Sequence, residues 1–313
     1  MLITGGCGLI GANLVSYILN RTSAKITVLD NLSKGNKGSI EGLDAELIVG
    51  DVRSKDVVDQ VTEGKDTVIH LAAQTGVIDS IEDPFKDACV NIEGSLNLLQ
   101  ASVKHGIKRF VFASSAAPLG EQSPPMHEGM VPRPISPYGA SKLSVEAYCS
   151  AFYGSFDLRT VSLRFSNVYG PGSLNKESVV ALFFKRILEG KPLIIYGDGN
   201  QTRDLIYVND ICKAIYVAFD LKDGGPDKHF GEVYQVGTGI ETSINRLADM
   251  IKRLVERTTD RKVDIRYVPE RKGEIKRNYS KIDKFKKVTG FEPEYSLEKG
   301  LENTWEFFGT FFK

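Results

Sequence analysis

Residues 2–14 read "LITGGCGLIGANL" and carry the pattern T-G-x-x-G-x-x-G at Thr4, Gly5, Gly8 and Gly11. A short apolar run precedes the glycines, and a helical pattern follows them. Small residues let the backbone approach a pyrophosphate closely, and a helix start offers N–H donors and a positive dipole end. The stretch therefore predicts a strand, a dinucleotide-binding loop and a helix.

An acidic residue at the end of the next apolar run supports this interpretation. Asp30 closes the segment "ITVLD", nineteen residues after Gly11. A carboxylate there accepts hydrogen bonds from the adenosine ribose hydroxyls and repels a 2′-phosphate, which favours NAD over NADP. A glycine pattern alone also occurs in ordinary tight turns, so Asp30 adds weight to the dinucleotide interpretation.

Short β-like runs alternate with helical patterns from residue 2 to about 168. The β-like runs are residues 2–4, 25–29, 46–49, 67–70, 108–112 and 160–164, with helical patterns such as 12–19 and 93–104 between them. This alternation predicts an α/β fold with a Rossmann-type, doubly wound parallel sheet. The later chain loosens into Gly- and Pro-rich loops and two helical patterns, near 243–257 and 297–311, which predict a smaller C-terminal region.

Composition narrows the class of protein. The 313 residues include 40 basic and 40 acidic side chains, so net charge gives no argument for binding nucleic acid or an anionic membrane. The four cysteines are far apart and form no C-x-x-C pair, so we expect neither disulfides nor a metal site. We find no apolar run long enough to span a bilayer and no signal peptide, and we expect a cytoplasmic protein.

Two further segments carry candidate chemistry. In "PISPYGASKLSVEAY" (134–148), Ser136 suits an N-cap and Pro137 the first helical position, so Tyr138 and Lys142 share one helix face. A neighbouring ammonium and a helix start both favour the phenolate, and a bound oxidised nicotinamide adds another positive charge. We expect these together to bring the phenol pKa toward the working pH. Y-x-x-x-K alone is common on surface helices.

In "FVFASSAAPLG" (110–120), an apolar strand ends in two serines, which either cap backbone or face a ligand.

These features occur in the order known from one enzyme family. The dinucleotide loop, the strand-end acid, the serines and Y-x-x-x-K are joined by "VIHLAAQTGV", "VNIEGSLNLLQA", "LRFSNVYGPG", "IYGDGNQTRDLIYVNDI" and "VGTG". The chain resembles the extended short-chain dehydrogenase/reductase family over nearly its whole length. It is most similar to the NAD-dependent epimerase/dehydratase branch, in particular to UDP-glucose and UDP-N-acetylglucosamine 4-epimerases.

The resemblance implies a role for each catalytic candidate. Tyr138 is the acid/base, and Lys142 holds the nicotinamide ribose and lowers the phenol pKa. Ser115 hydrogen-bonds the reacting sugar oxygen, and Ser114 supports it. The implied NAD-binding residues are Gly5, Gly8, Leu9, Ile10, Gly11, Asp30, Asn31, Ser33, Asp51, Val52, Leu71, Ala72, Ala73, Gln74, Asn91, Tyr138 and Lys142. For Asn91, tying backbone together is an equally plausible role.

The resemblance also implies a UDP-sugar site. Its residues are Ser115, Asn167, Val180, Tyr196, Arg203, Arg271, Glu274 and Asn278. The two arginines are expected at the diphosphate, which matches their fixed fork of donors. Tyr196 is expected near the base and Glu274 at the nucleotide's ribose. Counting from Glu274, Asn278 stands where a bulky Tyr excludes N-acetyl groups, and a small residue there leaves room for one. A shift of one residue would put Arg277 or Tyr279 at this position instead.

The implied activity is NAD-dependent 4-epimerisation of a UDP-hexose through a transient 4-keto sugar. Ala116 and Ala117 stand where 4,6-dehydratases carry an Asp-Glu pair, which argues against dehydration. A UDP-uronic acid 4-epimerase, a 4-keto-sugar reductase and a non-catalytic NAD-sensing protein are the alternatives. Pro118-Leu119 departs from the family's usual Val-Tyr, which puts the sugar pocket in question.

The resemblance further implies domain boundaries and a homodimer. We expect an NAD-binding domain at 1–166 plus about 206–240, and a nucleotide-sugar-binding region at about 167–205 plus 241–313. The dimer is expected through the helices 84–104 and 137–153, although an apolar stripe on either helix also fits ordinary core packing.

Overall fold

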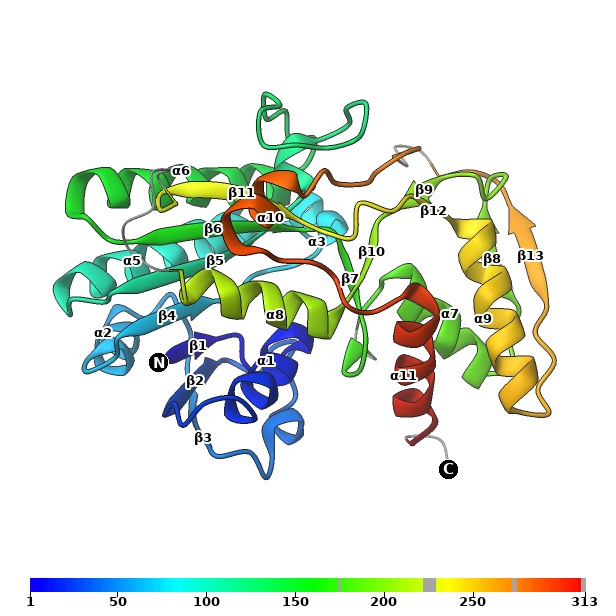
Figure 1. Cartoon of the computed structure of the whole chain (residues 1–313), viewed down its shortest axis with the longest axis horizontal. Coiled ribbons are helices and arrows are strands. Elements are labelled where there is room, and N and C mark those ends of the chain that lie inside the picture. Colours follow the sequence, from blue (N-terminus) through cyan, green and yellow to red (C-terminus); the bar gives the residue numbers. More distant parts are fainter. Residues whose placement is uncertain (174–175, 222–228, 272–274, 311–313) are drawn as a thin grey trace.

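The structure, a computed structural model, describes residues 1–173, 176–221, 229–271 and 275–310. Figure 1 shows a sheet covered by helices on two sides, with a smaller group of helices and strands beyond one end of it. The N-terminus lies in the sheet, and the described chain ends in the last helix of the smaller group. The predicted fold class, a Rossmann-type α/β sheet with a smaller C-terminal region, is confirmed.

Seven parallel strands form the main sheet in the order β11-β6-β5-β4-β1-β2-β3. Their bounds are β1 Leu2–Thr4, β2 Ile26–Asp30, β3 Ala45–Val49, β4 Thr67–His70, β5 Arg109–Ser115, β6 Thr160–Phe165 and β11 Glu232–Val236. The six predicted strands are all present. Strand β5 runs three residues further than predicted, because Ala113, Ser114 and Ser115 continue the ladder with β6.

Apolar residues on both faces of the sheet explain its two helical layers. Neighbouring residues alternate: Ile3 packs in the core on the side of α1 (Leu9–Leu19) and α8 (Val208–Phe219), and Leu2 in the core on the other side. That other side is covered by α2 (Lys55–Thr62), α5 (Gly94–Lys104) and α6 (Pro137–Phe156). A sheet buried on both faces is typical of parallel α/β proteins.

Short elements connect the main layers. They are η1 (Lys37–Ile40), α3 (Val77–Glu82), α4 (Pro84–Ala88), a π-helical turn η2 (Cys89–Glu93), and η3 (Ala117–Leu119) after the two serines. Pro118 and Leu119, which depart from the family pattern, are both buried in η3. The Leu119 side chain therefore packs inward.

The smaller region contains strands that the sequence pattern did not predict. Three two-stranded pairs join β7 (Asn167–Tyr169) to β10 (Leu205–Tyr207), β8 (Leu193–Tyr196) to β13 (Ile265–Val268), and β9 (Thr202–Arg203) to β12 (Thr242–Ser243). The helices are α7 (Val179–Leu188), α9 (Ile244–Thr258), α10 (Asp283–Thr289) and α11 (Leu297–Thr310). The predicted helices near 243–257 and 297–311 are α9 and α11, with residue 311 outside the described chain. In Figure 1, α7, α9 and α11 lie together with β8 and β13.

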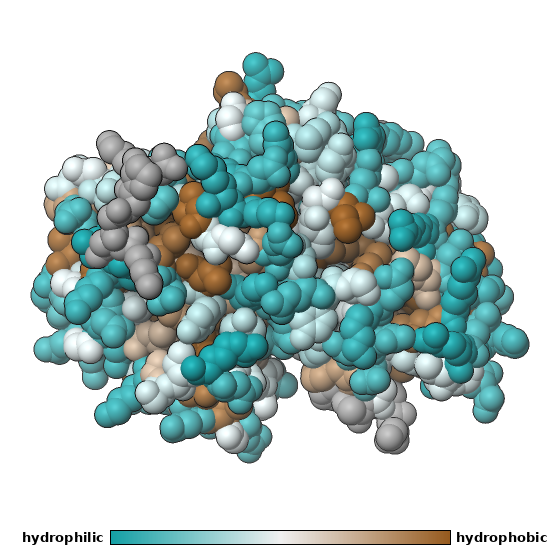
Figure 2. Space-filling view, viewed as in Figure 1, coloured by the Kyte–Doolittle hydropathy of each residue, from teal (hydrophilic) through white to brown (hydrophobic). Residues whose placement is uncertain are grey.

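The face shown in Figure 2 is mostly hydrophilic, with hydrophobic residues visible in patches between polar side chains. Among the residues that the structure describes, no helix is long and apolar enough to cross a membrane.

Candidate active site

Strand ends bring most of the predicted residues to one edge of the sheet. Strands β5, β4, β1 and β2 are neighbours and run parallel, so their carboxyl ends share that edge. These ends carry Ser115, the segment 71–74, the glycine loop and Asp30, in that order. Ligands of open α/β sheets bind in the crevice outside this edge.

The glycine loop is too tight for side chains at two positions. Gly5 has a φ of +69°, and a Cβ on Gly11 would lie 2.3 Å from the carbonyl oxygen of Gly5. Helix α1 follows Gly8 without a side-chain cap. The first-turn N–H groups, those of Leu9, Ile10 and Gly11, therefore have no partner inside the helix. An uncapped helix start beside a tight glycine turn fits the diphosphate of a dinucleotide.

Asp30 ends β2 directly beside this loop, as predicted. Its Oδ2 accepts the N–H of Cys7 at 2.9 Å, and its Oδ1 accepts the N–H of Leu32 at 2.8 Å. Leu32 has a φ of +58°, so the chain turns sharply after the strand. The carboxylate thus holds the glycine loop and the following turn together at the place where a ribose is expected.

Asn31, Ser33 and Asp51 form a polar cluster next to Asp30, with Val52 buried behind it. The Arg53 guanidinium donates to both oxygens of Asp51, at 2.9 and 2.8 Å, and this pairing holds the Asp51 pKa far below its usual range. Asn31 Nδ2 donates to Asp51 at 3.0 Å, and the N–H of Ser33 donates to Asn31 Oδ1 at 3.0 Å. Arg53 is an exposed residue two positions after Asp51 that was not among the predicted site residues.

A directional hydrogen-bond chain fixes the strand end after β4. Thr4 Oγ1 lies 2.7 Å from His70 Nδ1, His70 Nε2 lies 2.8 Å from Ser95 Oγ, and Ser95 donates to the Asn91 carbonyl at 2.5 Å. Because Ser95 has a single proton, His70 must donate from Nε2 and accept from Thr4 at Nδ1. The Thr4 hydroxyl in turn accepts the N–H of Ala72 at 3.2 Å. Burial lowers the pKa of His70 to about 3, so the ring stays neutral.

The rest of the predicted cofactor wall is held in the same way. The N–H of Leu71 donates to the Thr4 carbonyl at 3.1 Å, and Ala73 follows on the same partly exposed segment. Asn91 is buried, and its amide binds both backbone groups of Gln74, at 2.8 and 3.1 Å. Asn91 therefore ties backbone together, which is the alternative to cofactor binding given for this residue above.

Ser115, Tyr138 and Lys142 converge at the ends of β5 and α6. Ser136 Oγ accepts the N–H of Gly139 at 3.1 Å and Pro137 starts α6, which confirms the predicted cap and places Tyr138 in the first turn. The Ser115 side chain lies close enough to the Tyr138 phenol to lower its pKa. One helical turn later, the Nζ of Lys142 lies 5.8 Å from the Tyr138 ring centre.

In the protein alone, the ammonium and the helix start do not lower the phenol pKa. Burial raises the pKa of Tyr138 to about 12; the Ser115 side chain lowers it, and the charge of Asp87 raises it. Burial also lowers the pKa of Lys142 to about 8, and its Nζ donates to the Ala113 carbonyl at 2.8 Å. Desolvation of the ring has a larger effect on the Tyr138 pKa than the charges and the helix start that were considered from the sequence.

Ser114 supports the strand end through a buried ion pair that the sequence did not reveal. Its hydroxyl donates to Glu146 Oε1 at 2.5 Å. Glu146 also binds Arg164 through two hydrogen bonds, at 2.8 and 2.6 Å, and both side chains are at most 4% exposed. Three elements, β5, α6 and β6, therefore meet at this carboxylate.

Apart from Ser115, the predicted sugar-nucleotide residues that the structure describes lie in the smaller region, on its strands, its loops and helix α7. Asn167 is exposed at the start of β7, and its Nδ2 lies 3.3 Å from the carbonyl oxygen of Asp204. Val180 is buried in the first turn of α7, so its side chain packs in the core. Asn278 is partly buried in the last described segment.

Both predicted arginines have partners within the smaller region. The Arg271 guanidinium lies 3.7 Å from the ring centre of Tyr196, a close cation–π stack. Arg203 donates to the carbonyl of Ile275 at 2.7 Å. Glu274, expected at the ribose, lies outside the described residues.

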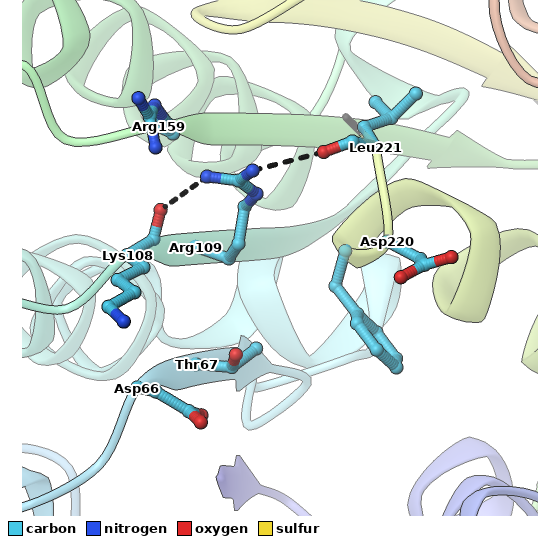
Figure 3. Close-up of a pocket in the computed structure, with 8 residues that line it drawn as sticks. Asp66, Thr67, Lys108, Arg109, Arg159, Asp220 and Leu221 are labelled. Carbon is cyan, nitrogen blue, oxygen red and sulfur yellow. Dashed lines mark hydrogen bonds between the residues drawn. The ribbon is translucent and has the colours of Figure 1, made fainter. Parts of the chain in front are cut away.

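A separate pocket of about 440 Å³ lies at the opposite edge of the sheet. It is lined by residues at the amino ends of β4, β5 and β6 and the end of α8, namely Asp66, Thr67, Lys108, Arg109, Arg159, Phe219, Asp220 and Leu221. In Figure 3 the Arg109 guanidinium reaches toward the carbonyls of Lys108 and Leu221, at 3.1 and 3.0 Å. In a parallel sheet this edge faces away from Ser115 and the glycine loop. Within the described ranges, no cluster of His, Cys, Asp or Glu could hold a metal ion.

Comparison with known proteins decides the family. The model of the "NAD dependent epimerase/dehydratase family" matches residues 1–237, which is most of the chain and includes the loop, the serines, Tyr138 and Lys142. The chain belongs to this family. As a member of the NAD-dependent epimerase/dehydratase family, it is a nucleotide-sugar enzyme that uses NAD.

Curated members of the family resemble the chain over its whole length. A UDP-glucose 4-epimerase of Mycolicibacterium smegmatis is 34% identical, with 98% of this chain and 97% of that protein covered. A UDP-glucuronate 4-epimerase of Thermodesulfobacterium geofontis is 32% identical, with 97% and 94% covered. At such identities the family is established, and the sugar differs from member to member.

Solved structures of the epimerase/dehydratase family superpose closely. The UDP-glucose 4-epimerase of Thermotoga maritima with UDP-glucose has a TM-score of 0.90 at 35% identity, covering 100% of this chain and 99% of that one. The UDP-N-acetylglucosamine 4-epimerase of Methanobrevibacter ruminantium with UDP-N-acetylmuramic acid has 0.89 at 34%, covering 99% and 97%. The Thermus thermophilus UDP-glucose 4-epimerase with NAD has 0.85 at 33%, covering 98% of both.

Proposed function

We propose that this protein is an NAD-dependent UDP-hexose 4-epimerase acting on the glucose/galactose pair or its N-acetylated counterpart. The observation that carries the proposal is the meeting of Ser115, Tyr138 and Lys142 beside the glycine loop at one sheet edge. Relatives that bind UDP-sugars support it.

The residues around the loop fit NAD. The open N–H groups at the start of α1 suit the diphosphate, and Asp30 at the strand end suits the adenosine ribose. The strand end 71–74 is proposed as a wall of the cofactor site, and Asn91, which binds the backbone of Gln74, as a residue near the cofactor. When bound, NAD supplies the acceptor and later the donor of the hydride at sugar C4, so no cofactor is consumed.

The protein's own groups handle the proton. Tyr138 takes the proton of the sugar 4-hydroxyl as the 4-keto form arises, and returns it to the same oxygen after the sugar has turned about its diphosphate linkage. Ser115 donates to that oxygen throughout, and the ammonium of Lys142 favours the phenolate. Because the Tyr138 pKa is raised to about 12 in the protein alone, chiefly by burial, the charge of Lys142 must act together with that of the cofactor.

Residues on the smaller region are proposed to hold the UDP group. Arg203 and Arg271 bind the diphosphate, Tyr196 lies along the base, and Asn167 binds the sugar nucleotide. Glu274 is proposed at the ribose, and Asn278 leaves room for an N-acetyl group. The backbone of Val180, in the first turn of α7, completes the site.

Dehydration is disfavoured by the residues after Ser115. Ala116 and Ala117 are partly exposed at the start of η3, and neither offers an acid or a base to the sugar. Elimination of water needs both groups at this place. The UDP-glucuronate 4-epimerase among the relatives keeps a uronate substrate as the second candidate.

We also propose a homodimer, the two-part domain division and a cytoplasmic location. Hydrophobic side chains on α3 and α4 support the dimer: Val77, Ile78 and Ile81 are exposed, and Phe85 is 84% exposed. Both helices pack beside α6, one of the two expected dimer helices. An exposed apolar group of this kind is typical of interaction surfaces.

The four free cysteines, three of them buried, fit the proposed cytoplasmic location, which is a reducing compartment.

The experiment that tests the function is the Tyr138→Phe variant. We expect it to retain bound NAD and to lose most 4-epimerase activity, because only the phenolic hydroxyl is removed. Turnover near that of the unmodified protein would end the assignment.

A further inference from the structure

Lys142 is a buried cation without a directly bonded carboxylate among its described contacts. The residue is 3% exposed, its Nζ donates to the Ala113 carbonyl at 2.8 Å, and it lies 4.7 Å from the Phe112 ring centre. A carbonyl and an aromatic face stabilise an ammonium, but a buried charge also needs an opposite charge close by. The proposed function requires Lys142 to be charged.

Glu146 lies one helical turn from Lys142, but a different cation already neutralises it. Arg164 binds both oxygens of Glu146, at 2.8 and 2.6 Å. Glu146 still raises the pKa of Lys142, but the larger part of its hydrogen bonding goes to Arg164 and Ser114.

Asp87, on α4, is the other buried carboxylate beside the catalytic helix. It is 1% exposed, and its Oδ1 accepts from the Asn91 amide at 2.9 Å. The same Asn91 Nδ2 lies 3.1 Å from the Oγ of Ser141, the residue directly before Lys142. Asp87 is therefore tied to α6 at the catalytic pair, through groups that carry no charge.

The electrostatics of the cluster follow from this geometry. Burial lowers the pKa of Lys142, and Asp87 opposes this most strongly, ahead of Glu146. Burial raises the pKa of Asp87, and the Ser141 hydrogen bond and the charge of Lys142 lower it. Asp87 also raises the pKa of Tyr138. The other titratable groups acting on Lys142 are Lys176 and Cys149, and His70 lies within the field of Lys142.

We propose that Asp87 is a positioning residue of the active site, the counter-charge that keeps the buried Lys142 cationic beside Tyr138. The inference rests on the proposed function for its catalytic meaning, but the charge pairing itself is measurable without substrate. Asp87 lies outside the glycine loop, the two serines and the Y-x-x-x-K pattern, so the proposal gives a role to a residue that none of these motifs contains.

Titration of Lys142 by NMR tests the pairing directly. The protein is labelled with ¹³C at lysine Cε, and the Lys142 signal is assigned by its absence in Lys142→Met. In the isosteric variant Asp87→Asn we expect the Lys142 titration to move to lower pH by about one to three units. Asp87→Glu should restore most of the shift. Glu93→Gln, which removes an exposed carboxylate from the adjacent turn, should leave it unchanged.

The reciprocal variant covers a failure of Asp87→Asn to fold. In Lys142→Met, the Asp87 carboxyl, labelled with ¹³C, should titrate at higher pH than in the unmodified protein, because coupling between two sites is mutual. An unchanged Lys142 titration in folded Asp87→Asn, or an unchanged Asp87 titration in Lys142→Met, would overturn the proposal. Either result leaves the epimerase assignment untouched, because neither measurement uses turnover.

With the epimerase active, the pH–rate profile gives a second readout. Removing a negative charge lowers the pKa of both Tyr138 and Lys142, so both limbs of the profile in Asp87→Asn should move to lower pH. A purely structural role for Asp87 would lower the maximum without moving the limbs, and that outcome would contradict the proposal.

Discussion

The Nζ of Lys142 lies 5.8 Å from the ring centre of Tyr138, one turn further along α6. Both are carried by a helix whose N-cap and first proline set where that first turn begins. The end of β5 brings Ser115 to the same phenol. A helix start and a strand end, separated by more than twenty residues of chain, thus form one acid–base group.

Gly11→Ala should weaken NAD binding. A Cβ at this position would lie 2.3 Å from the Gly5 carbonyl and 2.5 Å from the Gly6 Cα, so the loop must move. Overpacking of this kind costs about 1–3 kcal/mol, or roughly tenfold in affinity for each 1.4 kcal/mol. Bound NAD after purification and its affinity by calorimetry are the measurements.

Gly154→Ala is the matched control, because it also lies in a helix but a Cβ there meets no atom within 4 Å. It should keep its NAD content. Equal NAD affinity in Gly11→Ala and the unmodified protein would contradict the placement of the dinucleotide at this loop.

Arg164→Met should destabilise the fold strongly. The substitution leaves the buried Glu146 carboxylate without its cation, which typically costs about 3–5 kcal/mol. The free energy of unfolding in urea measures the loss. Arg257→Met breaks the exposed pair with Glu302 and should change stability by no more than about 1 kcal/mol. Similar small losses in both variants would show that the buried pair is not a structural support.

His70 should make stability depend on acid pH. Its folded-state pKa, about 3, lies below the ordinary value of 6.5, so the unfolded chain binds a proton first as the pH falls. Stability from this residue is complete above about pH 6.5 and is lost by up to about 1.4 kcal/mol per pH unit below it. Urea unfolding at pH 7.5 and 5 in the unmodified protein and in His70→Gln isolates the effect. Equal losses in the two proteins would contradict it.

Phe85→Glu should convert the proposed dimer to a monomer. The side chain is 84% exposed on the apolar group of α3 and α4, and a carboxylate there cannot be buried between two copies without a partner. Light scattering measures the mass. Tyr267→Glu, an exposed aromatic on β13, should leave the mass unchanged. A monomeric unmodified protein, or a dimeric Phe85→Glu, would exclude this surface.

Local sequence pattern predicted the sheet and the positions of the first cofactor residues. Alternating apolar runs located six strands, and Asp30 was expected at a strand end because the run before it stops there. The three small strand pairs were not predicted, because strands of two to four residues, such as β9, contain too few residues to show a period of two. Ser136 and Pro137 predicted the start of α6, because helix caps are local features.

Properties that depend on burial could not be predicted. Glu146 and Arg164 are eighteen residues apart, and nothing in either segment shows that both are enclosed. Asp87 was not singled out either, because its local sequence does not show that it is buried beside α6. The raised pKa of Tyr138 in the protein alone could not be predicted for the same reason, because desolvation comes from residues packed around the ring and not from its neighbours in the chain.

The central claim is tested most directly by incubating the purified protein with UDP-glucose, UDP-N-acetylglucosamine and UDP-glucuronate, without added cofactor. We predict that the protein converts UDP-glucose or UDP-N-acetylglucosamine to its C4 epimer, with no net change in nicotinamide absorbance. Three results would contradict the epimerase assignment: conversion of UDP-glucuronate alone, consumption of added reduced cofactor in step with product, or no conversion of any of the three sugars despite bound NAD.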